Sequence, residues 1–381
     1  MAQLAEIIGW IAVAGALCGA SFAVAAAFAV RNFARKPAPL PQLGFPALTL
    51  LKPLYGAEPG LERNLETFCV QKYAAPIQLL FGVHDPEDEA TSVVADLKRR
   101  HPYLDIALII GANREAPNPK IANLIDMIPH AKHDVLVLSD SDICVPPDYA
   151  SKLAGALEPP QVGAVTCCYT GEPATKNFWS NLSAMGINYQ FLPNVLIGVA
   201  MGLATPCFGS TIAFKRSTLE QIGGFRAFSD RLADDYEIGR AVRARGYRVG
   251  LPPLIVAHSC SETSAAELLR HELRWSRTIR GIDPWGFLGS VVTHSLPLSL
   301  IGAILLGFSL PAGLTVAAAV AARLLLKSQI DRLFGCRSPA WLIVFRDLLS
   351  FVVFIGALFT KNVEWRGVRY QVSSAGALAR D

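Results

Sequence analysis

The sequence predicts an α/β domain with a mostly parallel sheet, flanked by N-terminal and C-terminal transmembrane helices. Two features of the chain support this prediction. Of the 381 residues, 52% are hydrophobic and only 17% are charged, and the apolar excess lies near the two ends. Between Leu48 and Gly250, short apolar runs alternate with amphipathic stretches, as strands alternate with helices around a parallel sheet.

The first expected element is a membrane anchor over residues 1–36. Residues 7–30 carry no charge, and such a run can cross a hydrocarbon core of about 30 Å. Basic residues follow at once: Arg31, Arg35 and Lys36. Positive charge at this end of the segment places the next domain in the cytoplasm. A cleaved signal peptide is the alternative, but it would need a basic start, and Glu6 is the only charged residue there.

A linker with four prolines, residues 36–46, leads to the main domain, which we expect at 47–285. Strands are expected at 47–51, 77–83, 106–110 and 135–138, and helices at 61–70, 91–100 and 120–128. In an open parallel sheet, ligands bind at the carboxyl ends of the strands. Polar residues that follow these strands are therefore candidates for a binding site.

Asp140 and Asp142 follow the buried apolar run 135–138 directly. Because residues i and i+2 at a strand end point the same way, both carboxylates can face one divalent cation. A cation with open coordination positions can neutralise the leaving phosphate of a nucleoside diphosphate-sugar. The pattern therefore indicates a glycosyl or nucleotidyl transferase. The alternative is a solvated turn after a strand.

Two further acidic motifs occur along the chain. Asp85 and Asp88 follow the second expected strand, so they would lie at the same edge of the sheet. Asp234 and Asp235 begin a later helix. A carboxylate there can act as the general base that takes the proton of an attacking hydroxyl. The alternative is that these acids only favour the positive end of the helix dipole.

A helix over 271–280 combines cationic and aromatic side chains, with Arg274, Trp275 and Arg277 within one turn. Arginine suits a pyrophosphate leaving group because its planar fork matches phosphate oxygens. The alternative is an amphipathic helix on the membrane surface, with Trp275 at headgroup depth.

Other classes of site are not favoured. None of the eight cysteines forms a Cys-x-x-Cys pair or has a histidine at zinc spacing, so structural zinc and a disulfide framework are not expected. The net charge of +4 is modest, and the basic residues border apolar segments. They are therefore interpreted as membrane flanks, and no nucleic-acid partner is expected.

Taken in order, these motifs resemble those of membrane glycosyltransferases of family 2 and, more closely, of family 21, the ceramide glucosyltransferases. That family has three aspartate motifs followed by a (Gln/Arg)-x-x-Arg-Trp box. The matching residues are Asp85 with Asp88, Asp140 with Asp142, Asp235, and His271 through Trp275. Further matches run nearly end to end, at 50–54, 64–68, 118–121, 123–124, Trp365, Arg366, Arg369 and Tyr370. One departure is His271, which stands where the family has Gln or Arg.

The resemblance implies a GT-A type nucleotide-sugar-binding domain that transfers a sugar from UDP with inversion. It also implies a role for each matching residue: Asp85 or Asp88 would hold the uridine part, Asp140 and Asp142 would bind Mg²⁺ or Mn²⁺, and Lys120, Asp140, His271, Arg274 and Trp275 would bind the nucleotide-sugar. Asp235 would deprotonate the acceptor hydroxyl, with Asp234 as the alternative base.

The acceptor follows from the resemblance alone. Residues 165–171, 232–236 and 271–275 look most like the bacterial branch associated with hopanoid biosynthesis, which implies transfer of N-acetylglucosamine to bacteriohopanetetrol at the bacterial inner membrane. A ceramide glucosyltransferase is the alternative. A processive polysaccharide synthase is more distant, because three or four membrane segments are few for a polymer channel. A non-catalytic scaffold would explain neither the strand-end carboxylates nor their order.

The stretch 191–214 carries no charge, yet a single crossing there would separate Asp140 from Asp235. We therefore expect it to enter the bilayer without crossing, as a buried strand plus an interfacial element that lines the acceptor entrance. Gly209 would lie by the sugar, where glycine permits close approach or marks a strand kink.

Residues 286–360 are expected to form the C-terminal membrane segments, followed by a basic tail at 361–381. Segments 291–310 and 312–326 predict a helical hairpin. Its exit is basic: Arg323, Lys327, Arg332 and Arg337. Segment 340–359 contains Arg346 and Asp347 near its start, which favours a re-entrant or flat helix over a crossing.

Overall fold

The computed structural model describes residues 1–111, 116–359, 362–365, 368–372 and 378–380. The chain divides into two compact units. We name them the sheet unit, Lys36–Lys176 with Thr205–Ser261, and the helical unit, Met1–Arg35 with Asn177–Ala204 and Glu262–Asp381. Segments 177–204 and 262–285 therefore group with the apolar helices, although they were expected in the same domain as the sheet.

The main sheet of the sheet unit has seven strands within the described residues, in the order β3-β2-β1-β4-β8-β6-β9. Their bounds are β1 Leu48–Pro53, β2 Ile77–Val83, β3 Asp105–Ile110, β4 Val135–Leu138, β6 Val162–Thr166, β8 Ile212–Lys215 and β9 Arg248–Gly250. Strands β1 to β4 are parallel, and only β8 runs antiparallel to its neighbours. A smaller sheet joins β5 Ile143–Cys144, β10 Ile255–Cys260 and β7 Cys168–Pro173.

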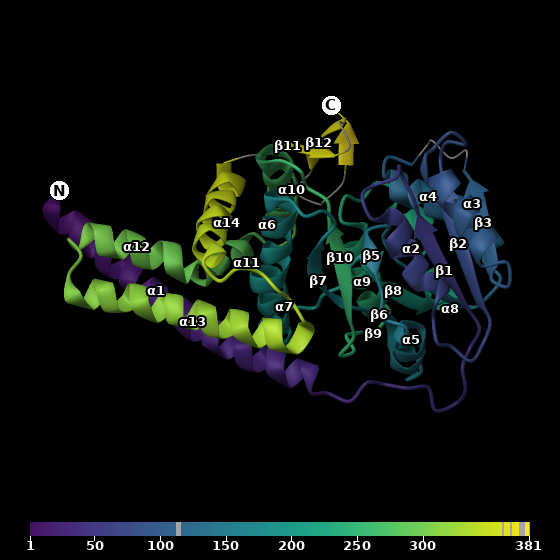
Figure 1. Ribbon diagram of the computed structural model, residues 1–381, viewed down its shortest axis with the longest axis horizontal. Helices are drawn as coiled ribbons and strands as arrows, with labels where there is room; N and C mark the ends of the chain where they lie inside the picture. Colours follow the sequence, from purple (N-terminus) through teal and green to yellow (C-terminus); the bar gives the residue numbers. More distant parts are fainter. Residues whose placement is uncertain (112–115, 360–361, 366–367, 373–377, 381) are drawn as a thin grey trace. The chain divides into compact units, whose positions relative to one another are not determined.

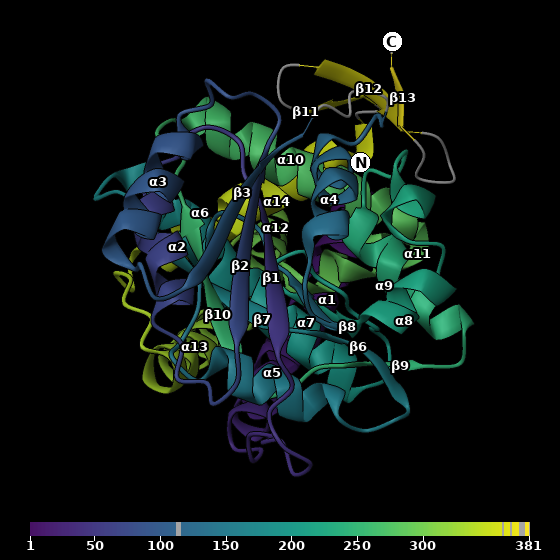
Figure 2. The same cartoon turned by 90° about the vertical axis from the view of Figure 1, so that its right-hand side faces the viewer.

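Helices cover both faces of the main sheet, with α2 and α3 on one face and α4 on the other (Figure 2). The helix bounds are α2 Leu61–Cys69, α3 Ala90–Arg100, α4 Pro119–Met127, α5 Tyr149–Leu157, α8 Arg216–Gln221 and α9 Asp234–Ala244. The core on the α4 side is apolar, with Leu51, Leu136 and Phe214 fully buried. The predicted fold class is confirmed, because each of the four expected strands and three expected helices forms within two residues of its expected bounds.

Helices make up most of the helical unit, and all of the long ones except the amphipathic α10 are apolar (Figure 1). Their bounds are α1 Ala2–Ala34, α6 Phe178–Gly186, η2 Ile187–Phe191, α7 Leu192–Ala200, α10 Ala265–Ile282, α11 Pro284–Gly289, η4 Ser290–Thr293, α12 Ser295–Leu305, α13 Leu310–Phe334 and α14 Leu342–Phe359. Three strands follow: β11 Asn362–Trp365, β12 Val368–Val372 and β13 Leu378–Arg380. Arg366, one of the family matches, lies outside the described residues.

Within the described part of the chain, α1, α13 and α14 are each long and apolar enough to cross a membrane. The pair α11–η4 and α12 would pass the same test together, but it is bent by 65°. The predicted hairpin is therefore corrected in its first arm, which breaks before Ser295. Pro297 has no backbone N–H to bond to the preceding turn, so it suits the first turn of a new helix but not the middle of a continuous one.

The second arm also differs from its expected form. Helix α13 continues to Phe334 and ends at Gly335, whose left-handed backbone (φ 72°) favours glycine. Arg323 and Lys327 lie within this helix and their side chains are buried, so the prediction that they form a basic flank where the hairpin leaves the membrane is wrong. Arg332 and Arg337 are exposed at its end, as expected.

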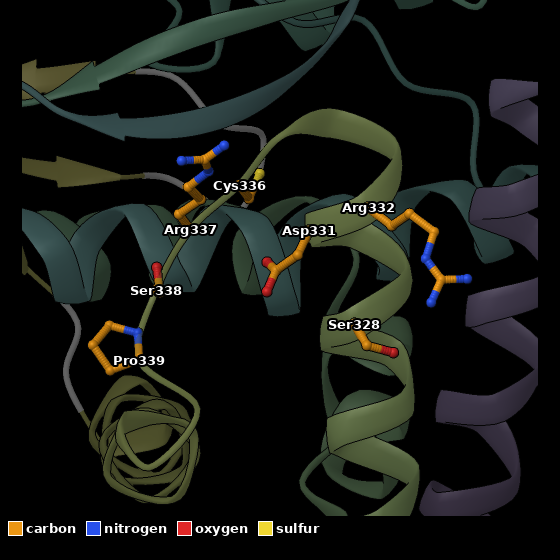
Figure 3. Close-up of a pocket in the computed structure, with 7 residues that line it drawn as sticks. All are labelled: Ser328, Asp331, Arg332, Cys336, Arg337, Ser338 and Pro339. Carbon is orange, nitrogen blue, oxygen red and sulfur yellow. The ribbon is translucent and has the colours of Figure 1, made fainter.

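A shallow, open pocket of about 660 Å³ lies at the end of α13 (Figure 3). Its lining residues are Ser328, Asp331, Arg332, Cys336, Arg337, Ser338 and Pro339. None of the residues assigned to the site from the sequence lines it. Figure 3 looks nearly along α14, whereas α13 lies in the plane of the picture, and Figure 1 agrees that α14 runs across α13.

Candidate active site

The carboxyl ends of β1, β2 and β4 lie side by side, because these parallel strands are neighbours with β1 in the middle. Asp85 follows β2, and Asp140 follows β4. In such sheets this edge is where ligands bind. Both carboxylates thus follow the carboxyl ends of strands on either side of β1, at one edge of the sheet, as expected.

Lys120 joins two of the acidic motifs. Its Nζ lies 2.6 Å from Asp140 Oδ1 and 3.4 Å from Asp234 Oδ2. Burial lowers the pKa of Lys120, but the surrounding carboxylates outweigh burial and raise it overall, so the ammonium stays charged. Asn118 positions the lysine: its Oδ1 accepts a hydrogen bond from Lys120 N–H at 3.0 Å and caps α4, while its amide donates to Asp234 Oδ1 at 3.2 Å.

Asp235 is half-buried at the start of α9. Its Oδ2 accepts the Gly209 N–H at 2.9 Å, and its Oδ1 accepts the Tyr236 N–H at 2.7 Å. Burial and the charge of Asp234 raise the pKa of Asp235 to about 6, against the lowering effects of Lys120 and the two N–H donors. A carboxylate with this pKa is ionised at neutral pH and can still accept a proton efficiently.

Gly209 lies between the two acidic motifs. Its N–H donates to Asp235, and its carbonyl accepts the Asp140 N–H at 3.2 Å. A Cβ at this position would lie 2.7 Å from Asp140 Oδ2 and 2.8 Å from Lys120 Nζ, so the absence of a side chain lets these two groups approach the backbone closely. Since one residue contacts both aspartates, a single membrane crossing between them is excluded, as expected.

The second aspartate of the strand-end motif has a histidine partner. His258 on β10 places Nε2 3.1 Å from Asp142 Oδ2, and its ring lies 5.8 Å from the ring of Tyr169. Burial lowers the pKa of His258, but Asp142 outweighs it and raises it well above its usual value. Burial and the charges of Asp235, Asp142 and Asp140 raise the pKa of Tyr169 well above its usual value. Neither His258 nor Tyr169 was among the site residues predicted from the sequence.

Within the described residues, no three His, Cys, Asp or Glu side chains are already gathered around one point that a metal ion would fill. The donors are nonetheless those of a hard cation. Burial raises the pKa of Asp140, Lys120 lowers it and Asp142 raises it further, with a net increase. Burial contributes most to this increase and the charge of Asp142 adds to it, and a bound divalent ion would act in the opposite direction.

A buried lysine lies behind the strand-end motif. Lys52 Nζ donates to Ser139 Oγ at 3.2 Å and to the Asp140 carbonyl, and it lies 3.9 Å from the centre of the Phe68 ring. Burial lowers the pKa of Lys52 to about 7, although Asp140 and Asp142 act in the opposite direction. The sequence signal was a lone lysine that follows four apolar or small residues of one strand, but its partners could not be inferred locally.

The two acids of the first aspartate motif, Asp85 and Asp88, make different kinds of contact. Asp88 accepts hydrogen bonds from the N–H groups of Gly56 and Ala90, each with a shortest distance of 2.9 Å, so it ties the loop after β1 to the loop after β2. Asp85 is exposed, and its Oδ1 accepts only a local bond, from Glu87 N–H at 2.9 Å, among the hydrogen bonds of the described residues. Asp85 therefore has the greater freedom to meet a ligand.

His271, Arg274 and Trp275 lie on α10 of the helical unit. His271 Nδ1 bonds to Glu262 Oε1, and its ring lies 4.4 Å from that of Trp275. Burial raises the pKa of Glu262, but the hydrogen bond and charge of His271 outweigh burial and lower it overall. The histidine that departs from the family pattern is thus held by a carboxylate.

Comparison with known proteins identifies the family. Residues 11–378 match the sequence profile of glycosyl transferase family 21. The chain belongs to this family. It is therefore a glycosyltransferase, and the resemblance seen in its motifs is confirmed.

Relatives and solved structures agree with this assignment. Ceramide glucosyltransferase 1 of Caenorhabditis elegans is 22% identical over 362 residues, which cover 92% of this chain and 76% of the relative. An N-acetylglucosaminyltransferase of Azorhizobium caulinodans is 22% identical over 218 residues, 56% of this chain and 54% of the relative. A mannosyltransferase of Pyrobaculum calidifontis, solved with GDP-Man and Mn²⁺, has a TM-score of 0.53 at 22% identity and covers 92% of this chain and 99% of its own. The fold is thus of the GT-A type.

Proposed function

We propose that this family 21 enzyme transfers a sugar, N-acetylglucosamine or glucose, from a UDP-sugar to the hydroxyl of a membrane lipid with inversion. The observation that carries the proposal is the cluster formed by Asp140, Lys120, Asp234 and Asp235, in which acids from distant parts of the chain converge at the carboxyl edge of the sheet. A donor phosphate, a cation and an acceptor hydroxyl all need charged groups in such an arrangement.

Asp140 and Asp142 would hold Mg²⁺ or Mn²⁺, which supplies positive charge to the leaving diphosphate when bound. Carboxylate oxygens suit either ion. His258 bonds to Asp142 and would fix the orientation of that carboxylate, as outer partners of metal ligands commonly do.

In the proposed mechanism, Asp235 takes the proton of the acceptor hydroxyl as its oxygen attacks the anomeric carbon. The pKa of about 6 and the half-buried position suit this role. Asp234 is buried and bonded to Asn118, which suits a positioning role. A single displacement gives a β-linked product from an α-linked donor.

Asp85 would hold the uridine part of the donor, since Asp88 is engaged by backbone N–H groups. Arg274 would stabilise the departing UDP, and Trp275 would line the same site. His271 would contribute through the pair that it forms with Glu262.

We propose bacteriohopanetetrol, a hopanoid polyol, as the first acceptor to test, on the sequence motifs at 165–171 and 232–236. Ceramide is the second candidate, because relatives that cover most of the chain are named ceramide glucosyltransferases. Exposed apolar side chains on one side of α14, such as Phe345, Val352 and Phe359, support contact with lipid.

For the topology, we propose that α1 anchors the enzyme in a bacterial inner membrane with the sheet unit in the cytoplasm, and that α14 lies flat or re-enters. Arg31 and Arg35 flank α1 on the side of the sheet unit, in agreement with the positive-inside rule. A reporter fused after Asp381 tests this arrangement, because it should be active as a cytoplasmic GFP and inactive as a periplasmic phosphatase. The reverse result would show that α14 crosses.

The decisive experiment is to identify the product. The enzyme is expressed in a host without glycolipids, supplied with bacteriohopanetetrol or ceramide, and the lipid extract is analysed by mass spectrometry. A lipid heavier by one N-acetylhexosamine or one hexose, absent with the D235N variant, is the expected result. UDP release without any glycosylated lipid would contradict the proposed acceptor class.

A further inference from the structure

Two adjacent residues of opposite charge lie buried in α14, and the proposed chemistry gives them no role. Arg346 and Asp347 are each 4% exposed, although α14 is one of the most apolar segments of the chain. Burying charged side chains in apolar, membrane-type segments costs free energy, so such residues usually have a functional role. The partners of Arg346 and Asp347 indicate that role.

Arg346 reaches α10 and pairs with Glu272, the residue that follows His271 in the Arg-Trp box. Nη1 lies 2.6 Å from Oε1, and Nη2 lies 2.9 Å from Oε2. The Nη2 contact is a hydrogen bond and the Nη1 contact adds charge attraction, so together they restrict the orientation of the guanidinium as well as its distance from the carboxylate. Gly186 on α6 leaves the space for the guanidinium, since a Cβ there would lie 2.7 Å from Nη2.

Asp347 reaches α13 and pairs with Arg323 in the same manner. Arg323 Nε lies 2.7 Å from Oδ2, and Nη2 lies 2.6 Å from Oδ1. The third nitrogen of this arginine, Nη1, donates to the Tyr189 carbonyl at 2.9 Å. Consecutive residues of α14 thus hold two different helices through two-point ion pairs, and α14 acts as a brace between α10 and α13.

A second contact fixes α10 along α14. Arg280, near the end of α10, donates from Nη1 to the carbonyls of Ala357 and Leu358 at 2.6 Å each. These carbonyls belong to the last turn of α14, where a cation is favourable. One contact thus lies near the start of α14 and the other in its last turn, so α10 can neither slide nor rotate freely on α14.

The two ties determine which side of α10 carries Arg274. An α-helix turns by about 100° per residue, so Arg280 lies about 80° from Glu272 around the helix axis, on the same side. Arg274 lies about 200° from Glu272 and therefore on the side away from α14. Loss of the ion pair between Glu272 and Arg346 would allow α10 to rotate about its axis and so change the direction in which Arg274 points.

We propose that Glu272, Arg346, Asp347 and Arg323 are positioning residues that set the rotation of α10 and thereby aim Arg274 at the diphosphate of the donor. This inference rests on the proposed function, in which Arg274 contacts UDP. Buried ion pairs contribute little net stability, and in several proteins buried polar or ionic groups select one arrangement of the chain.

The test uses full-length enzyme in nanodiscs and measures the affinity for UDP with Mn²⁺ by calorimetry. We expect E272Q and R346M each to weaken UDP binding at least tenfold. The charge-swapped double variant E272R/R346E should bind UDP within threefold of the wild type, because the pair is restored with its polarity reversed. R332Q, which changes an exposed arginine of α13, is the matched control and should bind like the wild type.

A purely structural role for the pair predicts a different outcome: lower thermal stability of both single variants with UDP affinity of the folded protein within threefold of the wild type. That result would overturn the inference. The R274A variant separates this failure from failure of the proposed function. If R274A binds UDP like the wild type, the assigned role of the box is wrong and the inference is lost with it. If R274A weakens binding and the brace variants do not, only the inference is wrong.

Discussion

Lys120 Nζ lies 2.6 Å from Asp140 Oδ1 and, on its other side, 3.4 Å from Asp234. One ammonium group therefore joins the acid after β4 to the acids at the start of α9. Without it, Asp140, Asp234 and Asp235 would crowd uncompensated negative charge into a buried space. The lysine thus stabilises the arrangement that the proposed chemistry requires.

Replacement of Lys120 by methionine should lower kcat/KM for the UDP-sugar by about 100-fold, because the acids lose their shared partner and separate. K120R should retain more activity, since it keeps the charge. K152M is the matched control in the same unit, because Lys152 pairs only locally, with Asp148 at 2.7 Å, among the ion pairs of the described residues. Equal activity of K120M and K152M in the transfer assay would refute this role.

Asp235→Asn should abolish transfer, by about 1,000-fold or more, because a neutral amide cannot take the proton of the acceptor. UDP-sugar affinity, measured by calorimetry, should change less than about threefold, since Asn keeps an oxygen for the Gly209 N–H. Asp234→Asn should reduce activity less, through the loss of its tie to Lys120. If instead D234N were inactive and D235N active, Asp234 would be the base.

The pH profile should show the ionisation of Asp235. Its pKa of about 6 predicts that kcat/KM rises about tenfold per pH unit below 6 and levels off above it. The charged or titratable groups around it are Asp234, Lys120, Tyr169 and Cys207. Because the charge of Asp234 raises this pKa, D234N should move the acid limb to lower pH. If the acid limb of the pH profile lies at the same pH in D234N as in the wild type, a group other than Asp235 is responsible for it.

The same shift has an opposite consequence for stability. The pKa of Asp235 is higher in the folded protein than its ordinary value of 3.8, so the protonated form is favoured by folding. The stability associated with this group is present at low pH and is lost as the pH rises through about 6. Activity and stability therefore change in opposite directions over this range, as expected for a base held in a buried site.

The sequence was sufficient for the parts of the site that depend on local pattern. Two of the expected strands, β2 and β4, are almost fully buried and are followed within two residues by an aspartate, so the sequence pattern placed Asp85 and Asp140 at one edge of the sheet. Contacts between distant residues carry no such signal. His258 meets Asp142 only because β10 pairs with β5, and a two-residue strand has too little periodicity to be predicted.

The helical unit shows the same limit. Arg346 and Asp347 were recognised as unusual charges in an apolar segment, but Glu272 is 74 residues away in sequence and Arg323 is 24. From hydropathy alone, Arg323 was predicted to be a basic flank of a hairpin, because a hydropathy pattern contains no information about an acidic partner on another helix. Because Arg323 pairs with Asp347 on another helix, it is buried and does not mark the end of a membrane segment.

Removal of divalent ions should stop transfer, and Mn²⁺ or Mg²⁺ should restore it. D140N and D142N should each raise the half-saturating Mn²⁺ concentration by about 100-fold or more, because each removes a ligand. H258Q should raise it about tenfold, since it only frees the orientation of Asp142. D148N, on an exposed acid of the same unit, is the control. An H258Q effect equal to that of D142N would show that the histidine itself binds the ion.

Gly209→Ala should lower kcat by about 10-fold to 100-fold, because displacement of reacting groups by about 1 Å has effects of this size. The added Cβ would lie 2.7 Å from Asp140 Oδ2 and 2.8 Å from Lys120 Nζ, so one of these side chains must move. The loss should appear in single-turnover transfer, with little change in thermal stability, since both atoms are ends of flexible side chains. G313A is the control, because a Cβ at Gly313 meets no atom within 4 Å. If G209A transferred sugar as fast as G313A, the position would tolerate a side chain and the tight contact would have no part in catalysis.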